Sequence, residues 1–162
     1  MDRLLRLAPL ATSSAFVMCS ATQQFTMTSF FDPSVPPEGR EVVFPRWLQS
    51  FANISLMSGS ALVSTAVLCA ANAAIGPGDG VDQPATKLWL AGLAFTLGHL
   101  YPLRWGMKLM GLRNDGYKKY SKPEIVEFLG TFCKVNIQRL LLVDLPGWCC
   151  VFAAVFSSLS QS

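Results

Sequence analysis

The sequence predicts an all-α fold, a four-helix transmembrane bundle made by a single domain. The chain has 162 residues, of which 51% are hydrophobic and only 14% are charged, whereas a soluble domain carries about 25% charged residues. The apolar residues also gather in four long blocks, separated by segments rich in proline, glycine or basic residues. Blocks of this length are typical of membrane-spanning helices. The single membrane domain, residues 1–162, is therefore predicted to cross the bilayer at about 7–31, 47–75, 86–111 and 128–159.

The first predicted span, residues 7–31, follows the basic head MDRLLR. A cleaved secretory signal begins in the same way, but this apolar run is longer than a signal core and the rest of the chain is also membrane-like, so we predict a spanning helix. Hydroxyl and amide side chains within it predict that one face packs on protein and not on lipid. These are Ser13, Ser14, Ser20, Thr22, Gln23, Gln24 and Thr26.

The segment 32–47 contains four prolines and one glycine, which predict a loop with at most a short interfacial piece at 44–47. The second span follows at 47–75. Its small residues Gly59, Ser60 and Ser64 predict a face that packs closely on another helix.

The third span, 86–111, contains the only histidine of the chain, His99. Pro102 follows it and is expected to kink the helix or to free a backbone carbonyl. His99, Tyr101 and Arg104 are therefore a candidate functional cluster beside the kink. The alternative for His99 is a structural histidine whose hydrogen bonds are satisfied within the bundle.

The loop 113–124 is the most basic part of the chain and is interpreted as solvated or in contact with lipid headgroups. At its end, Ser121 is a suitable N-cap for a helix that begins with Pro123 and has Glu124 in its first turn. This helix is predicted to lead into the fourth span.

The fourth span, 128–159, carries Asn136, Arg139 and Asp144. A charged residue at the centre of a spanning helix costs roughly 2.5–3.5 kcal/mol, and such residues usually face the interior and mark a functional site. Asn136 and Arg139 are three apart and share a face. Asp144 lies five residues beyond Arg139, about 500° around a regular helix, so the two side chains are not expected to lie on one line. Another helix could still bridge them. The structural alternative is an Arg–carboxylate pair that joins two helices.

Several functional classes are disfavoured by what the sequence lacks. The five cysteines lie in apolar segments without CxxC spacing, and one histidine cannot form a multi-histidine metal centre. No nucleotide loop, GxSxG, HExxH or flavin-type glycine fingerprint occurs. The basic residues cluster in one loop without interleaved aromatics, which argues against nucleic-acid binding. We therefore predict no metal and no cofactor.

What remains is one base that titrates near neutrality, His99, and one permanent cation, Arg139, in apolar surroundings. This pair suits abstraction of an acidic proton from a hydrophobic substrate and stabilisation of the resulting anion.

Two short motifs resemble those of a known family. The segment Met110-Gly111-Leu112-Arg113-Asn114 resembles a family segment that ends in asparagine, and Phe132-x-x-x-Asn136-x-x-Arg139 resembles a Trp/Phe-x-x-x-Asn-x-x-Arg pattern. The family is that of the anthrone oxygenase-like small integral membrane proteins of fungal polyketide tailoring, whose order of four spans this chain shares. The chain has Leu112-Arg113-Asn114 where the family usually has Pro-Thr-Asn.

The resemblance implies a cofactor-independent monooxygenase of secondary metabolite biosynthesis, which oxidises an anthrone-like ketone to an anthraquinone with dioxygen. Within that activity, His99 is expected to be the catalytic base, with Arg139 and Asn136 holding the anion and Asn114 orienting the substrate. The remaining candidate substrate-binding residues are Tyr101, Arg104 and Asp144.

Two alternatives stay open. The same residues would serve a cofactor-free isomerase or cyclase, since proton abstraction is common to all three reactions. In the other alternative the chain is a non-catalytic four-helix scaffold or transport subunit. The predicted partners are a hydrophobic small molecule and the lipid bilayer, with a homo-oligomer as a further option, and the predicted location is the endoplasmic reticulum or a related endomembrane.

Overall fold

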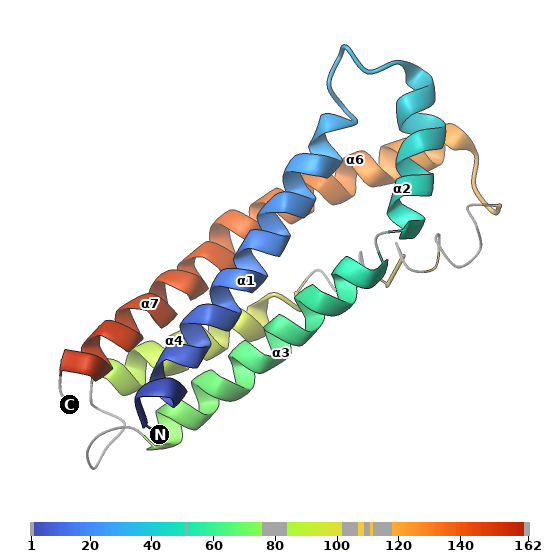
Figure 1. Ribbon diagram of the computed structural model, residues 1–162. Coiled ribbons are helices and arrows are strands. Elements are labelled where there is room, and N and C mark those ends of the chain that lie inside the picture. The colour runs from blue at the N-terminus through green and yellow to red at the C-terminus, as the bar shows by residue number, and fades with distance from the viewer. Residues whose placement is uncertain are drawn as a thin grey trace.

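The computed structural model describes residues 2–50, 52–75, 84–101, 107–108, 111 and 118–160, and within them every regular element is helical (Figure 1). This confirms the all-α prediction for that part of the chain. The elements are α1 (Asp2–Ser29), a π-helical turn η1 (Gly39–Val43), α2 (Phe44–Ser50), α3 (Ala52–Ile75), α4 (Pro84–Gly98), α6 (Lys122–Arg139), a second π-helical turn η2 (Leu140–Asp144) and α7 (Leu145–Ser160).

Within the described residues, three helices are long and apolar enough to cross a membrane: Arg3–Ser29, Leu56–Ile75 and the continuous rod Lys122–Ser160 formed by α6, η2 and α7. α4 has 15 residues, about 22 Å at 1.5 Å per residue, which is shorter than the roughly 30 Å of bilayer hydrocarbon. Much of the chain after residue 101 in the predicted third span lies outside the described residues, so a fourth span stays a prediction.

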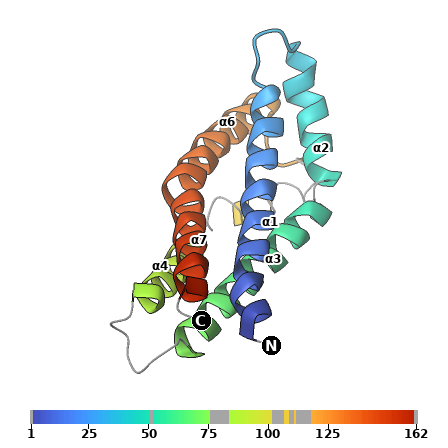
Figure 2. The ribbon, with the colours of Figure 1, turned by 60° about the vertical axis from the view of Figure 1, so that its left-hand side comes forward.

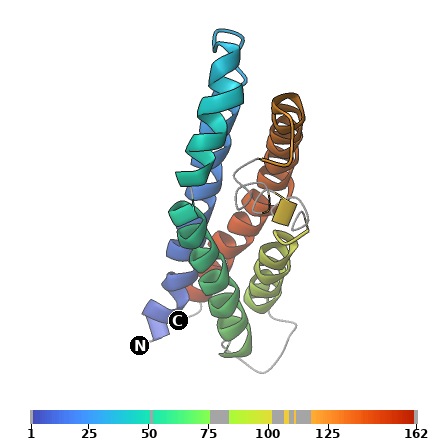
Figure 3. The same cartoon turned by 90° about the vertical axis from the view of Figure 1, so that its right-hand side faces the viewer.

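The helices pack in neighbouring pairs. α4 packs on α7, α1 packs on α3, and α3 and α1 also contact α4 and α7 respectively. Figures 2 and 3 show α7 beside α1 and α3 beside α4, with the start of α1 and the end of α7 at the same end of the molecule. A buried core of Cys69, Trp89, Val151, Ala154 and Val155 lies among α3, α4 and α7.

Glycine allows α4 and α7 to approach closely. A Cβ atom on Gly92 would lie 2.9 Å from Val151 Cγ2, and one on Gly147 would lie 2.9 Å from Phe95 Cβ. Small residues at such crossings allow membrane helices to make close van der Waals contact.

The segment 32–47 differs from its prediction as a loop, because residues 39–50 are helical. Pro36 precedes this helical region, while Pro45 lies inside it, just after the π-helical turn η1 in which the Phe44 N–H bonds to Gly39 O. Phe44 is fully buried and stacks on Phe30 with ring centroids 4.6 Å apart. This stacking fastens α2 to the end of α1.

The start of α6 is as predicted. Glu124 Oε2 accepts hydrogen bonds from the backbone N–H of Ser121 at 2.8 Å and from its hydroxyl at 2.7 Å. This reciprocal arrangement is a capping box, which fixes where the long rod begins.

Candidate functional site

The only histidine meets two charged residues of the long rod at a buried cluster. His99, directly after α4, has its Nδ1 atom 2.9 Å from Asp144 Oδ1. The other carboxylate oxygen, Oδ2, is 3.4 Å from Arg139 Nε. The Asp144 side chain is only 1% exposed, and those of His99 and Arg139 are 16% and 13% exposed. The three predicted residues His99, Arg139 and Asp144 therefore come together around one carboxylate.

Arg139 and Asp144 are in contact, contrary to the prediction from the sequence, and the π-helical turn η2 explains why. A regular helix turns about 500° in five residues and separates their side chains. In η2 the backbone N–H of Leu145 bonds instead to the carbonyl of Leu140, the i→i+5 pattern of a wider π turn. Residues five apart then lie nearly one above the other, and the ion pair forms within one continuous rod.

The Arg–carboxylate pair of the structural alternative is present, but it lies within one continuous rod and does not join two helices. The contact that joins two elements is the one between His99 and Asp144, which are 45 residues apart in sequence.

The carboxylate also determines which ring nitrogen of His99 carries the proton. An ionised Asp144 can only accept, so it favours the tautomer with the proton on Nδ1, which leaves the lone pair on Nε2. The Phe16 ring packs against the imidazole, with centroids 4.7 Å apart and planes at 75°. Arg139 balances the charge of Asp144, which would otherwise be a costly isolated ion in the interior.

Asn136 lies three residues before Arg139 and is buried, but its amide faces α1. Asn136 Nδ2 donates to Gln24 Oε1 at 2.7 Å, while Asn136 Oδ1 has no hydrogen-bond partner among the described residues. This bond joins α1 to α6, and a role for Asn136 in holding an anion stays a prediction.

The other predicted site residues fall elsewhere. Tyr101 is 87% exposed and so does not line the buried cluster. Arg104 and Asn114 lie outside the described residues.

Side chains from α1 complete the site, and the sequence carried a signal for them. The buried positions Ser13, Phe16, Ser20, Gln24 and Met27 recur at helical spacing. The prediction that hydroxyl and amide side chains of the first helix pack on protein is therefore confirmed for three of the residues it named, whereas Thr22 is exposed. Which of these residues would meet the histidine depends on the packing of α1 against the rod, and the sequence does not determine this.

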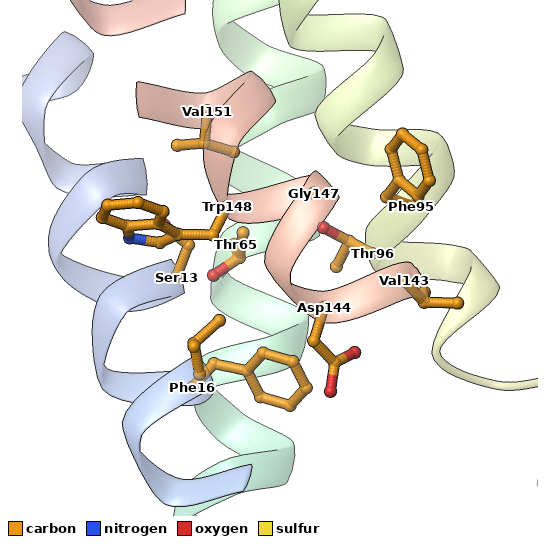
Figure 4. A pocket seen from close by; sticks show the side chains of 11 residues that line it. Ser13, Phe16, Thr65, Phe95, Thr96, Val143, Asp144, Gly147, Trp148 and Val151 are labelled. Carbon is orange, nitrogen blue, oxygen red and sulfur yellow. The ribbon is translucent and has the colours of Figure 1, made fainter. Parts of the chain in front are cut away.

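A small cavity lies beside Asp144, where α1, α3, α4 and the rod meet (Figure 4). It has room for about one water molecule. Its wall includes Asp144 itself and Phe16, which also contacts His99.

These features define a class: a small protein whose described elements are helical, with three helices long and apolar enough to cross a membrane, and with a histidine–carboxylate–arginine cluster around the buried Asp144. No family profile and no solved structure matches the chain. It is similar to a protein of Mollisia scopiformis named "Probable epoxidase scpX", with 28% identity over 158 residues that cover 97% of both chains. It is also 28% identical to "Oxaleimides biosynthesis cluster protein N" of Penicillium oxalicum, over 90% of this chain and 84% of that protein. Both relatives come from fungi, and neither name points to anthrone oxygenases in particular.

Proposed function

We propose that the chain is a membrane-embedded tailoring oxygenase of secondary metabolism, which removes a proton from a hydrophobic, electron-rich substrate and lets the resulting anion react with dioxygen. In this proposal α4 and the residues after it form a fourth span, which completes a four-helix transmembrane bundle in the endoplasmic reticulum or a related endomembrane. The names of the two relatives and the apolar helices support the coarse class. The cluster of His99, Asp144 and Arg139 supports the proposed chemistry.

The observation that carries the proposal is the 2.9 Å contact between His99 Nδ1 and Asp144 Oδ1. A carboxylate in this position orients the imidazole and stabilises the imidazolium that forms when Nε2 takes a proton. A base positioned in this way contributes about 10²–10⁴-fold to a rate.

Arg139 supplies the fixed positive charge. Its Nε faces Asp144, and the guanidinium has two further nitrogens in the same plane. We assign these terminal nitrogens to the oxygen of the substrate anion, as in other recognition of planar oxyanions by arginine.

The oxidation balances without a further reductant. The substrate CH₂ group loses one proton to His99, and the carbanion forms a C–O bond with dioxygen to give, after reprotonation, a hydroperoxide. Loss of water from the hydroperoxide breaks the O–O bond and leaves a ketone. One oxygen atom ends in the product and the other in water, which is the overall change from an anthrone to an anthraquinone.

A second outcome is favoured by the name of the Mollisia scopiformis relative, "Probable epoxidase scpX". The same hydroperoxide can transfer its distal oxygen to a neighbouring C=C bond, which gives an epoxide and leaves an alcohol. Both outcomes share the first proton transfer, so both depend on His99.

The test is turnover in lipid nanodiscs with a panel of anthrones and substituted hydroquinones, followed by dioxygen uptake and product mass. We expect His99→Ala to lower the rate by about 10²–10⁴-fold with unchanged helicity, and Lys118→Ala, in the exposed basic loop, to have no effect. A fully active His99→Ala protein would overturn the proposal. Isomeric products without dioxygen uptake would favour an isomerase or cyclase, and a folded protein that is inactive across the panel would favour a scaffold.

A further inference from the structure

The small cavity beside Asp144 is too narrow for an aromatic substrate. Pockets for drug-sized ligands measure about 300–1,000 Å³, whereas this cavity has room for only about one water molecule. An occupant therefore has to be a water molecule or a molecule of similar width.

The hydroxyl groups in its wall all donate their hydrogens within the protein. Ser13 Oγ donates to Leu10 O at 3.2 Å and Thr96 Oγ1 to Gly92 O at 2.7 Å. Thr65 Oγ1 lies 2.8 Å from Ala61 O and 2.9 Å from Thr12 Oγ1, so its hydrogen is also used within the protein. A buried water typically makes about three hydrogen bonds. Here these three side chains would offer it acceptors and no donor. Asp144 Oδ2, which has no hydrogen-bond partner among the described residues, is a further acceptor, so a water could donate its two hydrogens but would find no donor for its own oxygen among these four side chains.

The indole of Trp148 is committed in the same way, because its Nε1 donates to Ser14 Oγ at 2.9 Å. Much of the remaining wall is aromatic or aliphatic, and Figure 4 shows Phe16, Phe95, Val143 and Val151 around the space. An apolar diatomic molecule gives up few hydrogen bonds on entering such a cavity. Dry apolar cavities in proteins bind xenon for the same reason.

The position of the cavity connects it to the proposed reaction. Asp144 forms part of its wall and also holds His99, and Phe16 lines the cavity and packs on the imidazole. We propose that this cavity binds dioxygen, and that the organic substrate meets His99 outside the cavity. The inference rests on the oxygenase function proposed above. It places dioxygen beside Asp144, the residue that contacts His99.

Valine methyl groups provide a direct test that needs no substrate. Val151 lines the cavity, whereas Val155, four residues later on α7, does not, and both are fully buried. In methyl-labelled protein, we expect dissolved dioxygen to broaden the resonances of Val151 more than those of Val155, relative to a nitrogen-saturated sample. Equal broadening, or a water cross-peak at the Val151 methyls, would overturn the proposal.

A filling variant links the cavity to turnover. Val17 lines the cavity and Val17→Ile adds one methylene, while Val67→Ile, at an exposed position of α3, is the matched control. We expect Val17→Ile to raise the KM for dioxygen several-fold, to leave the KM for the organic substrate unchanged, and to abolish the selective broadening at Val151. An unchanged KM for dioxygen in a folded Val17→Ile protein would refute the inference. Selective broadening in a protein that turns over no substrate would refute only the proposed function.

Discussion

Replacing the carboxylate that joins the cluster, Asp144→Asn, separates its structural and catalytic roles. The change is nearly isosteric, so packing in the rod is preserved, but the negative charge between His99 and Arg139 disappears. Because the Asp144 side chain is 1% exposed, water does not replace the lost interaction. Arg139 then remains as a buried cation without its counter-ion.

The magnitude follows from the geometry. Removing one partner of a buried ion pair costs about 3–5 kcal/mol. Arg139 retains 13% exposure and its Nε lies 3.4 Å from Asp144 Oδ2, a long contact, so we expect the lower end, about 3 kcal/mol. For the rate, an amide in place of the carboxylate favours the wrong imidazole tautomer, a change that costs about 10⁴-fold in the serine-protease triad.

Unfolding of detergent-solubilised protein, followed by circular dichroism, measures the first quantity, and turnover in nanodiscs measures the second. The matched control is Arg139→Leu combined with Asp144→Asn, which removes both charges. Because buried ion pairs can be replaced by apolar groups at little cost, we expect the double variant to regain most of the stability and to remain inactive. If Asp144→Asn alone loses less than about 1 kcal/mol, the scale of one ordinary hydrogen bond, and keeps its activity, the reasoning about this cluster is wrong.

Two further predictions concern packing and pH. Gly147→Ala would place a Cβ 2.9 Å from that of Phe95, so we expect a loss of about 1–3 kcal/mol, measured by thermal unfolding, whereas Gly59→Ala meets nothing within 4 Å and should be neutral or stabilising. The pKa of the exposed Asp32 is lowered by hydrogen bonds from the hydroxyl and then the backbone N–H of Ser34. A lowered folded-state pKa stabilises this turn above the unfolded-state value, and the contribution is lost as the pH falls through the folded-state value. Ser34→Ala should therefore raise the pKa of Asp32 in an NMR titration, and an unchanged value would contradict the assigned cause.

Local sequence patterns predicted much of the fold, although the close-packing face predicted from Gly59, Ser60 and Ser64 is wrong, because Ser60 and Ser64 are exposed and a Cβ at Gly59 would meet nothing within 4 Å. Apolar blocks predicted the helical class, Ser121 and Glu124 predicted the start of α6, and the scarcity of charge singled out the residues that form the cluster. The pairing within the cluster was not predictable in the same way. The ion pair depends on one π-helical turn, which the 3.6-residue period does not contain, and the contact between α4 and η2 depends on how separate helices pack.

The charge balance of the cluster sets the conditions under which it can act as a base. Arg139 and Asp144 cancel, and with a neutral His99 the cluster carries no net charge, so it can be buried without an isolated ion. Transfer of a proton to His99 makes the cluster positive, while the substrate becomes negative at the same moment. The proton transfer is therefore favourable only while the anion stays beside the cluster, because separating the charges in a medium of low permittivity is costly. In the proposed reaction dioxygen therefore reacts with the anion where it forms, and a dioxygen site lined by Asp144, the residue that contacts His99, would serve this reaction.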